Sequence, residues 1–489
     1  MTTTRSFVKD VVGRAAFQVL SVVKGLVVLP LVARAYGASG YGIWTQISIT
    51  VALAAPLVSL RLNEAVVRYL SGIEPGTRRG RAFFTTIIVT WGLSVVLLIV
   101  GVLTVRGVSV AMFDDPGLTR YAFLALGMLV VSVSYSMATA YYRATSRISV
   151  NTFLNTIETL AVLAAVFGIA GWMKGSLDVV LLALIGIDVV LSAGCLIDIA
   201  RREGGFGLSR EWIGKFLRYS LPLIPTVALY WVVSSSDRFV IVHFRGLDQA
   251  GVYSAVYRAT QIIKILVHPL AFVLLPTMAA LWEKRREEVA LGFLSKALQW
   301  YLFAAIPAVA GLAAIGSPLV RLLGGGGDFA VSTGLVVLLA AAELFVGVYQ
   351  LWVYVLYVKE RNPILILFFA VAATLNLGGN LLLVPRIGIL GAAWTTFLAY
   401  AVQAALVVSY ARRLVDVRFP VSIVLRMCVA AGGVYLAAWA VPGTGWGDLV
   451  VRIVAGIGAY AFLAFALRIV RRDDLAPLVE WMRRRGGRS

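Results

Sequence analysis

Several ionisable side chains fall inside the long apolar stretches of this sequence, and eleven of them are candidates for a function. A charge near the centre of a bilayer costs about 2.5–3.5 kcal/mol on insertion scales, so each of these residues needs a partner or a function. They are Lys24, Arg61, Glu64, Glu158, Asp188, Asp237, Arg238, Arg258, Lys264, His268 and Glu343. The cations and the carboxylates among them predict two kinds of chemistry.

Four of the cations come from three apolar segments and could face one central cavity: Lys24, Arg61, Arg258 and Lys264. Arginine binds phosphate through paired hydrogen bonds and lysine binds it as a point charge. We therefore predict that these four residues receive an anionic headgroup that bears phosphate. The alternative is that each is neutralised locally, as Glu64 could do for Arg61 three residues earlier, or extends to an interface.

Two carboxylates lie deep in apolar segments, Asp188 and Glu343. Buried carboxylates can hold a proton, so we predict that these residues bind a coupling proton or Na⁺. The alternative is that either one pairs with a lysine across the helix bundle. The sequence has only two histidines and no His/Cys cluster with metal-ligand spacing, so we expect neither a metal site, nor a cofactor, nor an enzyme.

These charges are carried by fourteen apolar segments, each with about 20 or more residues, which is enough to cross a bilayer. Their approximate ranges are 11–34, 41–69, 82–105, 119–142, 149–172, 177–200, 214–243, 250–281, 291–317, 329–357, 363–384, 389–410, 420–441 and 447–468. The sequence therefore predicts an all-α, multi-pass membrane protein.

Positive charge alternates between the two sides of these segments. Of 44 Lys and Arg residues, 30 lie in the N-terminal segment, every second loop and the C-terminal tail, whereas the opposite side has 8. This distribution predicts that both termini are cytoplasmic and places the protein in the cytoplasmic (inner) membrane. Basic loops on one side of the membrane would contact anionic lipid headgroups, which accounts for the net charge of +20. We therefore do not expect nucleic acid as a partner.

A weak internal repeat suggests two lobes. The junction after the first segment, residues 36–44 (YGASGYGIW), resembles the junction after the seventh, residues 245–253 (RGLDQAGVY). Such repeats commonly enclose a substrate site. We predict lobes of six helices at residues 1–205 and 206–411, around a central cavity. Residues 412–489 then hold two further helices and a basic cytoplasmic tail, in which residues 473–489 suit a short interfacial helix.

Several stretches resemble one known family. They are residues 37–42 (GASGYG), 219–225 (YSLPLIP), 235–238 (SSDR), 251–257 (GVYSAVY) and 384–394 (VPRIGILGAAW). In this order and with this helix count, the chain resembles the polysaccharide-biosynthesis (Wzx-type) flippases of the multidrug/oligosaccharidyl-lipid/polysaccharide exporter superfamily.

The resemblance implies two six-helix lobes that alternate access to a cavity. It implies transport of a polyprenyl-diphosphate-linked oligosaccharide from the cytoplasmic to the outer leaflet, for assembly of surface polysaccharide such as O-antigen or exopolysaccharide. The expected partners are this lipid, the bilayer, and polymerases or glycosyltransferases of the same pathway. The family's cavity cations correspond only loosely to Lys24, Arg61, Arg258 and Lys264. The resemblance does not indicate which sugars the lipid carries.

Two other functions remain open at this point. A cation-coupled multidrug exporter of the same superfamily would favour an acidic cavity, which the four cations oppose. An integral-membrane glycosyltransferase, polymerase or ligase would need an acid/base constellation, usually on a sizeable external loop, and the sequence shows none.

Overall fold

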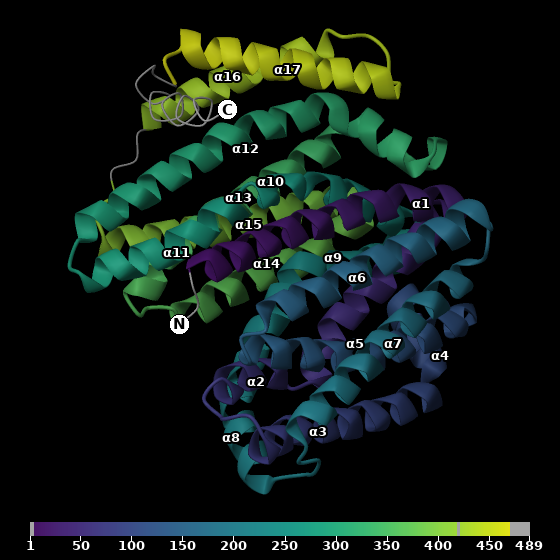
Figure 1. The fold of residues 1–489 in the computed structure, drawn as a ribbon. Helices are drawn as coiled ribbons and strands as arrows, with labels where there is room; N and C mark the ends of the chain where they lie inside the picture. Colours follow the sequence, from purple (N-terminus) through teal and green to yellow (C-terminus); the bar gives the residue numbers. More distant parts are fainter. Residues whose placement is uncertain (1–3, 418–420, 470–489) are drawn as a thin grey trace, which may run out of the picture. The chain divides into compact units, whose positions relative to one another are not determined.

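The computed structural model describes residues 4–417 and 421–469, with side chains from residue 24 onward. Within these ranges the secondary structure is entirely helical, which confirms the predicted all-α class (Figure 1). The α-helices are α1 (Thr4–Val58), α2 (Leu62–Leu70), α3 (Thr77–Leu103), α4 (Val105–Phe113), α5 (Thr119–Ala144), α6 (Ile148–Val166), α7 (Leu177–Glu203), α8 (Arg210–Ser220), α9 (Ile224–Thr260), α10 (Ile262–Ile265), α11 (His268–Glu283), α12 (Glu287–Gly324), α13 (Thr333–Val358), α14 (Ile364–Ile387), α15 (Ile389–Leu414), α16 (Val421–Trp439) and α17 (Trp446–Ala466). Single turns lie at Pro116–Leu118, Phe167–Trp172, Leu221–Leu223 and Gly327–Phe329.

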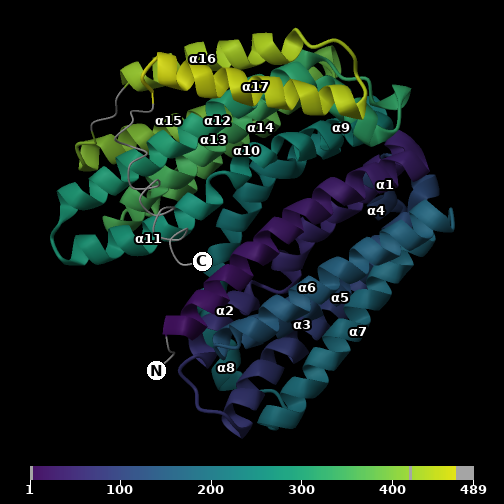
Figure 2. The same ribbon diagram turned by 45° about the horizontal axis from the view of Figure 1, so that its top comes forward.

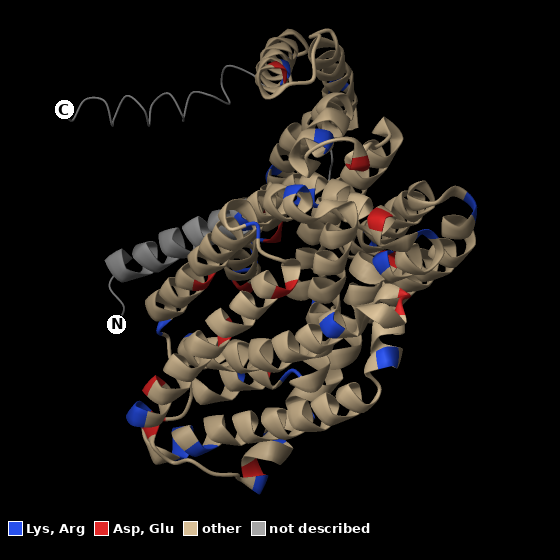
Figure 3. Ribbon diagram, turned by 90° about the vertical axis from the view of Figure 1, so that its right-hand side faces the viewer, with Lys and Arg blue, Asp and Glu red and all other residues tan. Residues whose placement is uncertain are grey.

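Twelve helical spans in the described part of the chain are long and apolar enough to cross a bilayer. Charged residues lie mainly toward the ends of the helices, and long stretches of helix between them carry none (Figure 3). The chain is therefore a multi-pass membrane protein. The count of fourteen helices and the cytoplasmic termini stay predictions, and residues 473–489 lie outside the described ranges.

Two compact units divide the chain. The first consists of Met1–Ala255, Leu323–Asp328 and Ala373–Ala392, and the second of Val256–Leu322, Phe329–Ala372 and Ala393–Ser489. These units are groups of residues in mutual contact, whereas the lobes proposed at 1–205 and 206–411 follow the sequence repeat. The lobe boundaries therefore stay a prediction.

The two junctions paired by the repeat adopt the same backbone conformation. Helix α1 is kinked at Gly37 (φ 69°, ψ −172°) and α9 at Gly246 (φ 83°, ψ 173°). These positive φ values suit glycine because a Cβ atom would clash with the backbone there. The predicted glycine turns are confirmed, and each kink lies inside one continuous helical run.

The same junctions pack against each other within the first unit, in a reciprocal way. A Cβ atom on Gly42 would collide with the carbonyl oxygen of Leu247, and one on Gly251 would collide with that of Ala38. The pairs Ala38/Gly42 and Leu247/Gly251 are each four residues apart on a helix, the spacing by which small residues let membrane helices approach closely. An offset of 209 residues relates Ala38 to Leu247 and Gly42 to Gly251, as expected for a repeat.

We expect Gly251→Ala to weaken this crossing. The obstacle is backbone, which cannot move aside as a side chain can, so the substitution should cost about 1–3 kcal/mol. The measurement is thermal unfolding of the purified protein in detergent. Gly194→Ala on α7 is the control, since nothing lies within 4 Å of a Cβ there. Equal stability of the two variants would contradict the crossing.

The core of the first unit includes both short amphipathic helices, α2 and α8. Leu62, Ala65, Val66 and Leu70 are buried on α2 with the i, i+3, i+4, i+8 spacing of one helical face. Trp212 and Phe216 are buried one turn apart on α8 and join the same cluster, with rings from α3 and α5. Figure 1 shows α2, α8 and the start of α3 side by side. This packing fixes which face of each helix points outward.

In the second unit, α16 and α17 form a paired hairpin (Figure 2). Arg452 of α17 donates to the carbonyl oxygens of Val441 (3.1 Å) and Ala314 (3.3 Å), and Tyr460 donates to that of Phe303 (2.7 Å). Because Ala314 and Phe303 belong to α12, these bonds attach the hairpin to the rest of its unit.

Candidate functional site

Arg61 lies at a break between two helices. Leu60 (φ 48°) and Arg61 (φ 56°) both occupy the left-handed region, which bulky residues rarely adopt. The Arg61 N–H bonds to the carbonyl of Pro56 (3.1 Å), five residues back, instead of continuing the α-helical pattern. The predicted segment 41–69 was therefore wrong as one continuous helix. Two neighbouring residues in this sparsely populated conformation, at a break between helices, are the kind of feature that clusters at binding sites.

The Arg61 side chain is partly accessible at this break. Its guanidinium lies 3.5 Å from the Glu64 carboxylate, and the two side chains are 25% and 33% exposed. The expectation that Glu64 faces Arg61 is confirmed. At this distance and exposure the pair is loose, so Arg61 keeps hydrogen-bond donors for another anion.

Lys264 also lies at an interruption, in the second unit. The N–H groups of Leu266 and Val267 bond three residues back, to Ile263 and Lys264, in place of the α-helical four. Pro269 follows and has no N–H to donate to the carbonyl of Ile265. The predicted segment 250–281 is thus divided into the end of α9, α10 and α11. The Lys264 side chain is half-buried.

Arg258 is the least enclosed of the four cations. Its side chain is exposed on the last turn of α9, and its Nη1 donates to Oε1 of Gln261 at 3.1 Å. No carboxylate lies within salt-bridge distance of Arg258 among the ion pairs of the described residues. Its charge therefore remains available.

Lys24 is bound to a carboxylate from another helix. Its Nζ donates to both oxygens of Glu158 on α6, at 3.0 and 3.2 Å. Asp188 on α7 interacts electrostatically with this pair. The hydroxyl of Tyr135 on α5 is buried without a hydrogen-bond partner and interacts with both carboxylates. The structure therefore gathers Lys24 and Asp188, which we had assigned to separate roles, into one polar cluster.

Glu343 is buried in α13, with 2% of its surface exposed. Tyr301 of α12 lies beside it and donates to the backbone carbonyls of Glu343 and Leu344 at 3.3 and 3.0 Å. The structure keeps Glu343 in the second unit and Asp188 in the first. It therefore places the two proposed coupling carboxylates in separate surroundings.

Sequence reasoning missed two features of this site. The break at Leu60 and Arg61 has no local signature except Pro56, and Glu158 was not recognised as the partner of Lys24. The opposite charges of Lys24 and Glu158, each near the middle of an apolar segment, were the available signal. Across the described residues, no group of three or more His, Cys, Asp or Glu side chains could hold a metal ion.

Comparison with known proteins gives a consistent result. Two proteins of Haloferax volcanii are similar: "Probable flippase AglR", 22% identical over 93% of this chain and 94% of its own, and "Probable low-salt glycan biosynthesis flippase Agl15", 21% identical over 80% of each. Among solved structures, the lipid II flippase MurJ in its inward closed conformation has a TM-score of 0.76, with 13% identity, covering 93% of this chain and 99% of MurJ. An inward-facing MATE multidrug resistance transporter of the MOP superfamily has a TM-score of 0.64, with 14% identity over 81% and 94%. These structures share the fold. The family of polysaccharide biosynthesis proteins matches residues 7–282, more than half of the sequence. The chain therefore belongs to the polysaccharide biosynthesis protein family.

Proposed function

We propose that this protein is a flippase for a glycan linked to a polyprenyl diphosphate, and that it moves this lipid from the cytoplasmic to the outer leaflet of the cytoplasmic membrane. In this proposal the protein is a transporter and not an enzyme. Its family, its similarity to proteins named flippases, and its MurJ-like fold support this function.

One observation carries the proposal. Arg61 and Lys264 lie where apolar helices are interrupted, in a chain of a polysaccharide biosynthesis family. Irregular backbone at membrane depth is tolerated where it lines a cavity, and broken helices form the substrate sites of many transporters. A cation at each break suits an anionic diphosphate and repels the cationic drugs that a multidrug exporter would carry.

Within the proposal, the predicted cations Lys24, Arg61, Arg258 and Lys264 bind the diphosphate, the chain is organised in lobes 1–205 and 206–411, and access to the bound lipid alternates between the two sides of the membrane. Both termini are cytoplasmic, and the lipid tail stays in the bilayer near the last two helices. Polymerases or glycosyltransferases would then take the glycan on the outer side.

We also propose that the cycle is coupled to protons or Na⁺. The cluster in the first unit brings two carboxylates, Glu158 and Asp188, to one cation, Lys24. The remaining negative charge is costly in a low-dielectric bundle, and a bound proton or cation would remove it. Glu343 is the second candidate because it is buried at mid-helix in α13.

If Asp188 binds the coupling ion, Asp188→Asn should reduce transport at least about tenfold, because its neutral amide mimics the protonated state permanently. Glu343→Gln tests the second carboxylate in the same way. The measurement is transport of a fluorescent lipid-linked glycan in proteoliposomes, with and without a pH or Na⁺ gradient. A variant that keeps the gradient dependence of the unmodified protein excludes its residue from coupling.

The first experiment is to extract lipids from cells that lack this protein and to analyse them by mass spectrometry. Accumulation of a polyprenyl-diphosphate glycan, with loss of a surface polymer, is the expected result and would identify the sugar. An unchanged lipid profile with all polymers intact would refute the flippase.

A further inference from the structure

The outward faces of α2 and α8 carry a group of cations outside the proposed cavity. Because Leu62, Ala65 and Val66 of α2 and Trp212 and Phe216 of α8 point into the core, the opposite faces are exposed. These faces present Arg68, Lys215 and Arg218, all exposed. The positive-inside pattern predicts that this surface is cytoplasmic, since residues 70–81 and 201–213 belong to the basic set of loops.

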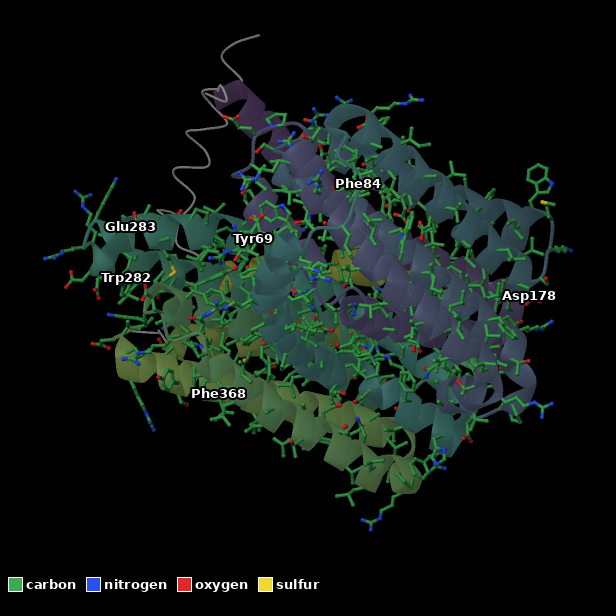
Figure 4. The ribbon with its side chains drawn as sticks, turned by 90° about the horizontal axis from the view of Figure 1, so that it is seen from below. Tyr69, Phe84, Asp178, Trp282, Glu283 and Phe368 are labelled. Carbon is green, nitrogen blue, oxygen red and sulfur yellow. The ribbon has the colours of Figure 1, made fainter. Side chains whose placement is uncertain are left out.

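The cations and the aromatic rings of the two helices are interleaved. Arg68 of α2 lies 4.5 Å from the ring centroid of Tyr219 on α8, and Lys215 of α8 lies 4.8 Å from that of Tyr69 on α2. The two tyrosine rings pack edge to face at 5.7 Å (Tyr69 is labelled in Figure 4). A cation held over a ring keeps its outer N–H groups free to donate to a further acceptor.

The carboxylates of these helices do not neutralise the three cations. Helix α2 has one acidic residue, Glu64, which faces Arg61, and α8 has one, Glu211, whose partner is Arg78 at 4.0 Å. None of the ion pairs among the described residues includes Arg68, Lys215 or Arg218. Between the helices is a hollow of about 560 Å³ lined by Tyr69, Gly214, Lys215, Arg218 and Tyr219.

We propose that Arg68, Lys215 and Arg218 form a binding site for the diphosphate headgroup of an isoprenoid lipid. Amphipathic helices with basic residues bind anionic headgroups at the membrane surface. A diphosphate offers more negative charge and more acceptor oxygens than the single phosphodiester of a phospholipid, and therefore matches three cations better. That this lipid is the transported glycan carrier, held here before it reaches the cavity, rests on the function proposed above.

The test is titration of the purified full-length protein with farnesyl diphosphate, followed by native mass spectrometry. The variant Arg68→Gln/Lys215→Gln/Arg218→Gln should bind about 100-fold more weakly, from roughly one kcal/mol per cation. The matched control Lys284→Gln/Arg286→Gln/Arg361→Gln removes three exposed cations from other loops predicted to be cytoplasmic. Figure 4 shows Trp282 and Glu283 at the end of α11, where this control begins. The control should bind within about threefold of the unmodified protein.

Arg218→Gln alone leaves the cation–ring contacts of Arg68 and Lys215 in place and should weaken binding about fivefold. This single variant tests the binding site even if the triple variant fails to fold. Equal weakening in the control variant would refute the site, since binding would then follow net charge. Displacement of farnesyl diphosphate by phosphatidylglycerol at equal concentration would overturn the diphosphate assignment in favour of membrane phospholipid. Binding is measured without translocation, so an unchanged lipid profile in cells would refute the flippase and leave this result standing.

Discussion

Glu203→Ala is expected to destabilise the protein by about 3–5 kcal/mol, the usual cost of removing one partner from a buried ion pair. Glu203, at the end of α7, is 3% exposed. Its carboxylate accepts hydrogen bonds from Nε of Arg79 (2.8 Å), the backbone N–H of Gly76 (2.8 Å) and the hydroxyl of Tyr141. These donors come from the start of α3 and from α5, so one carboxylate joins the ends of three helices. Without it, Arg79 would be left as a mostly buried, unpaired charge.

Chemical or thermal unfolding in detergent, followed by tryptophan fluorescence, measures this loss. Glu211→Ala is the matched control, because Glu211 pairs with Arg78 at 4.0 Å and both side chains are largely exposed. Exposed pairs contribute about 0–1 kcal/mol, so the control should unfold close to the unmodified protein. Equal losses in the two variants would show that the buried network adds nothing beyond a surface pair.

The sequence was sufficient to predict the helical membrane fold, because bilayer-length apolar segments have few alternatives. It also predicted the turns at Gly37 and Gly246, since a positive φ leaves a recognisable glycine. It did not predict that α8 would be a separate helix of residues 210–220, although Trp212 and Phe216 have the spacing of a buried face. Hydropathy alone merged α8 into the next segment, because a short amphipathic helix adds little to a bilayer-length average.

The candidate site was predictable by residue type but not by partner. A charge in an apolar segment is visible in the sequence, and Lys24, Arg61 and Lys264 were found in that way. Which carboxylate faces Lys24 depends on how α1 packs against α6, a contact between residues 134 positions apart. The left-handed backbone at Leu60 and Arg61 was equally hidden, because it is imposed by the surrounding fold and not favoured by either residue.

Arg61→Ala should reduce transport of the lipid-linked glycan about 10- to 100-fold while the protein remains folded. A hydrogen bond to a charged group contributes about 1.5–3 kcal/mol, and the substitution removes the donor at the helix break. The cost to folding should be small, because Glu64 is one-third exposed and water can solvate its carboxylate once Arg61 is gone. The assay is export in cells lacking the native protein, normalised to the amount of each variant in the membrane.

Two further variants separate the charge of Arg61 from its backbone conformation. Arg61→Gly removes the charge but suits φ 56° better than alanine does, so it should be more stable than Arg61→Ala and should lose transport to the same extent. Arg61→Lys keeps the charge without the planar pair of donors and should recover part of the transport. If glycine restored transport and lysine did not, Arg61 would serve only to break the helix. A graded order, with arginine above lysine and both above glycine and alanine, is what an anion bound at the break requires, because only the donor groups change along that series.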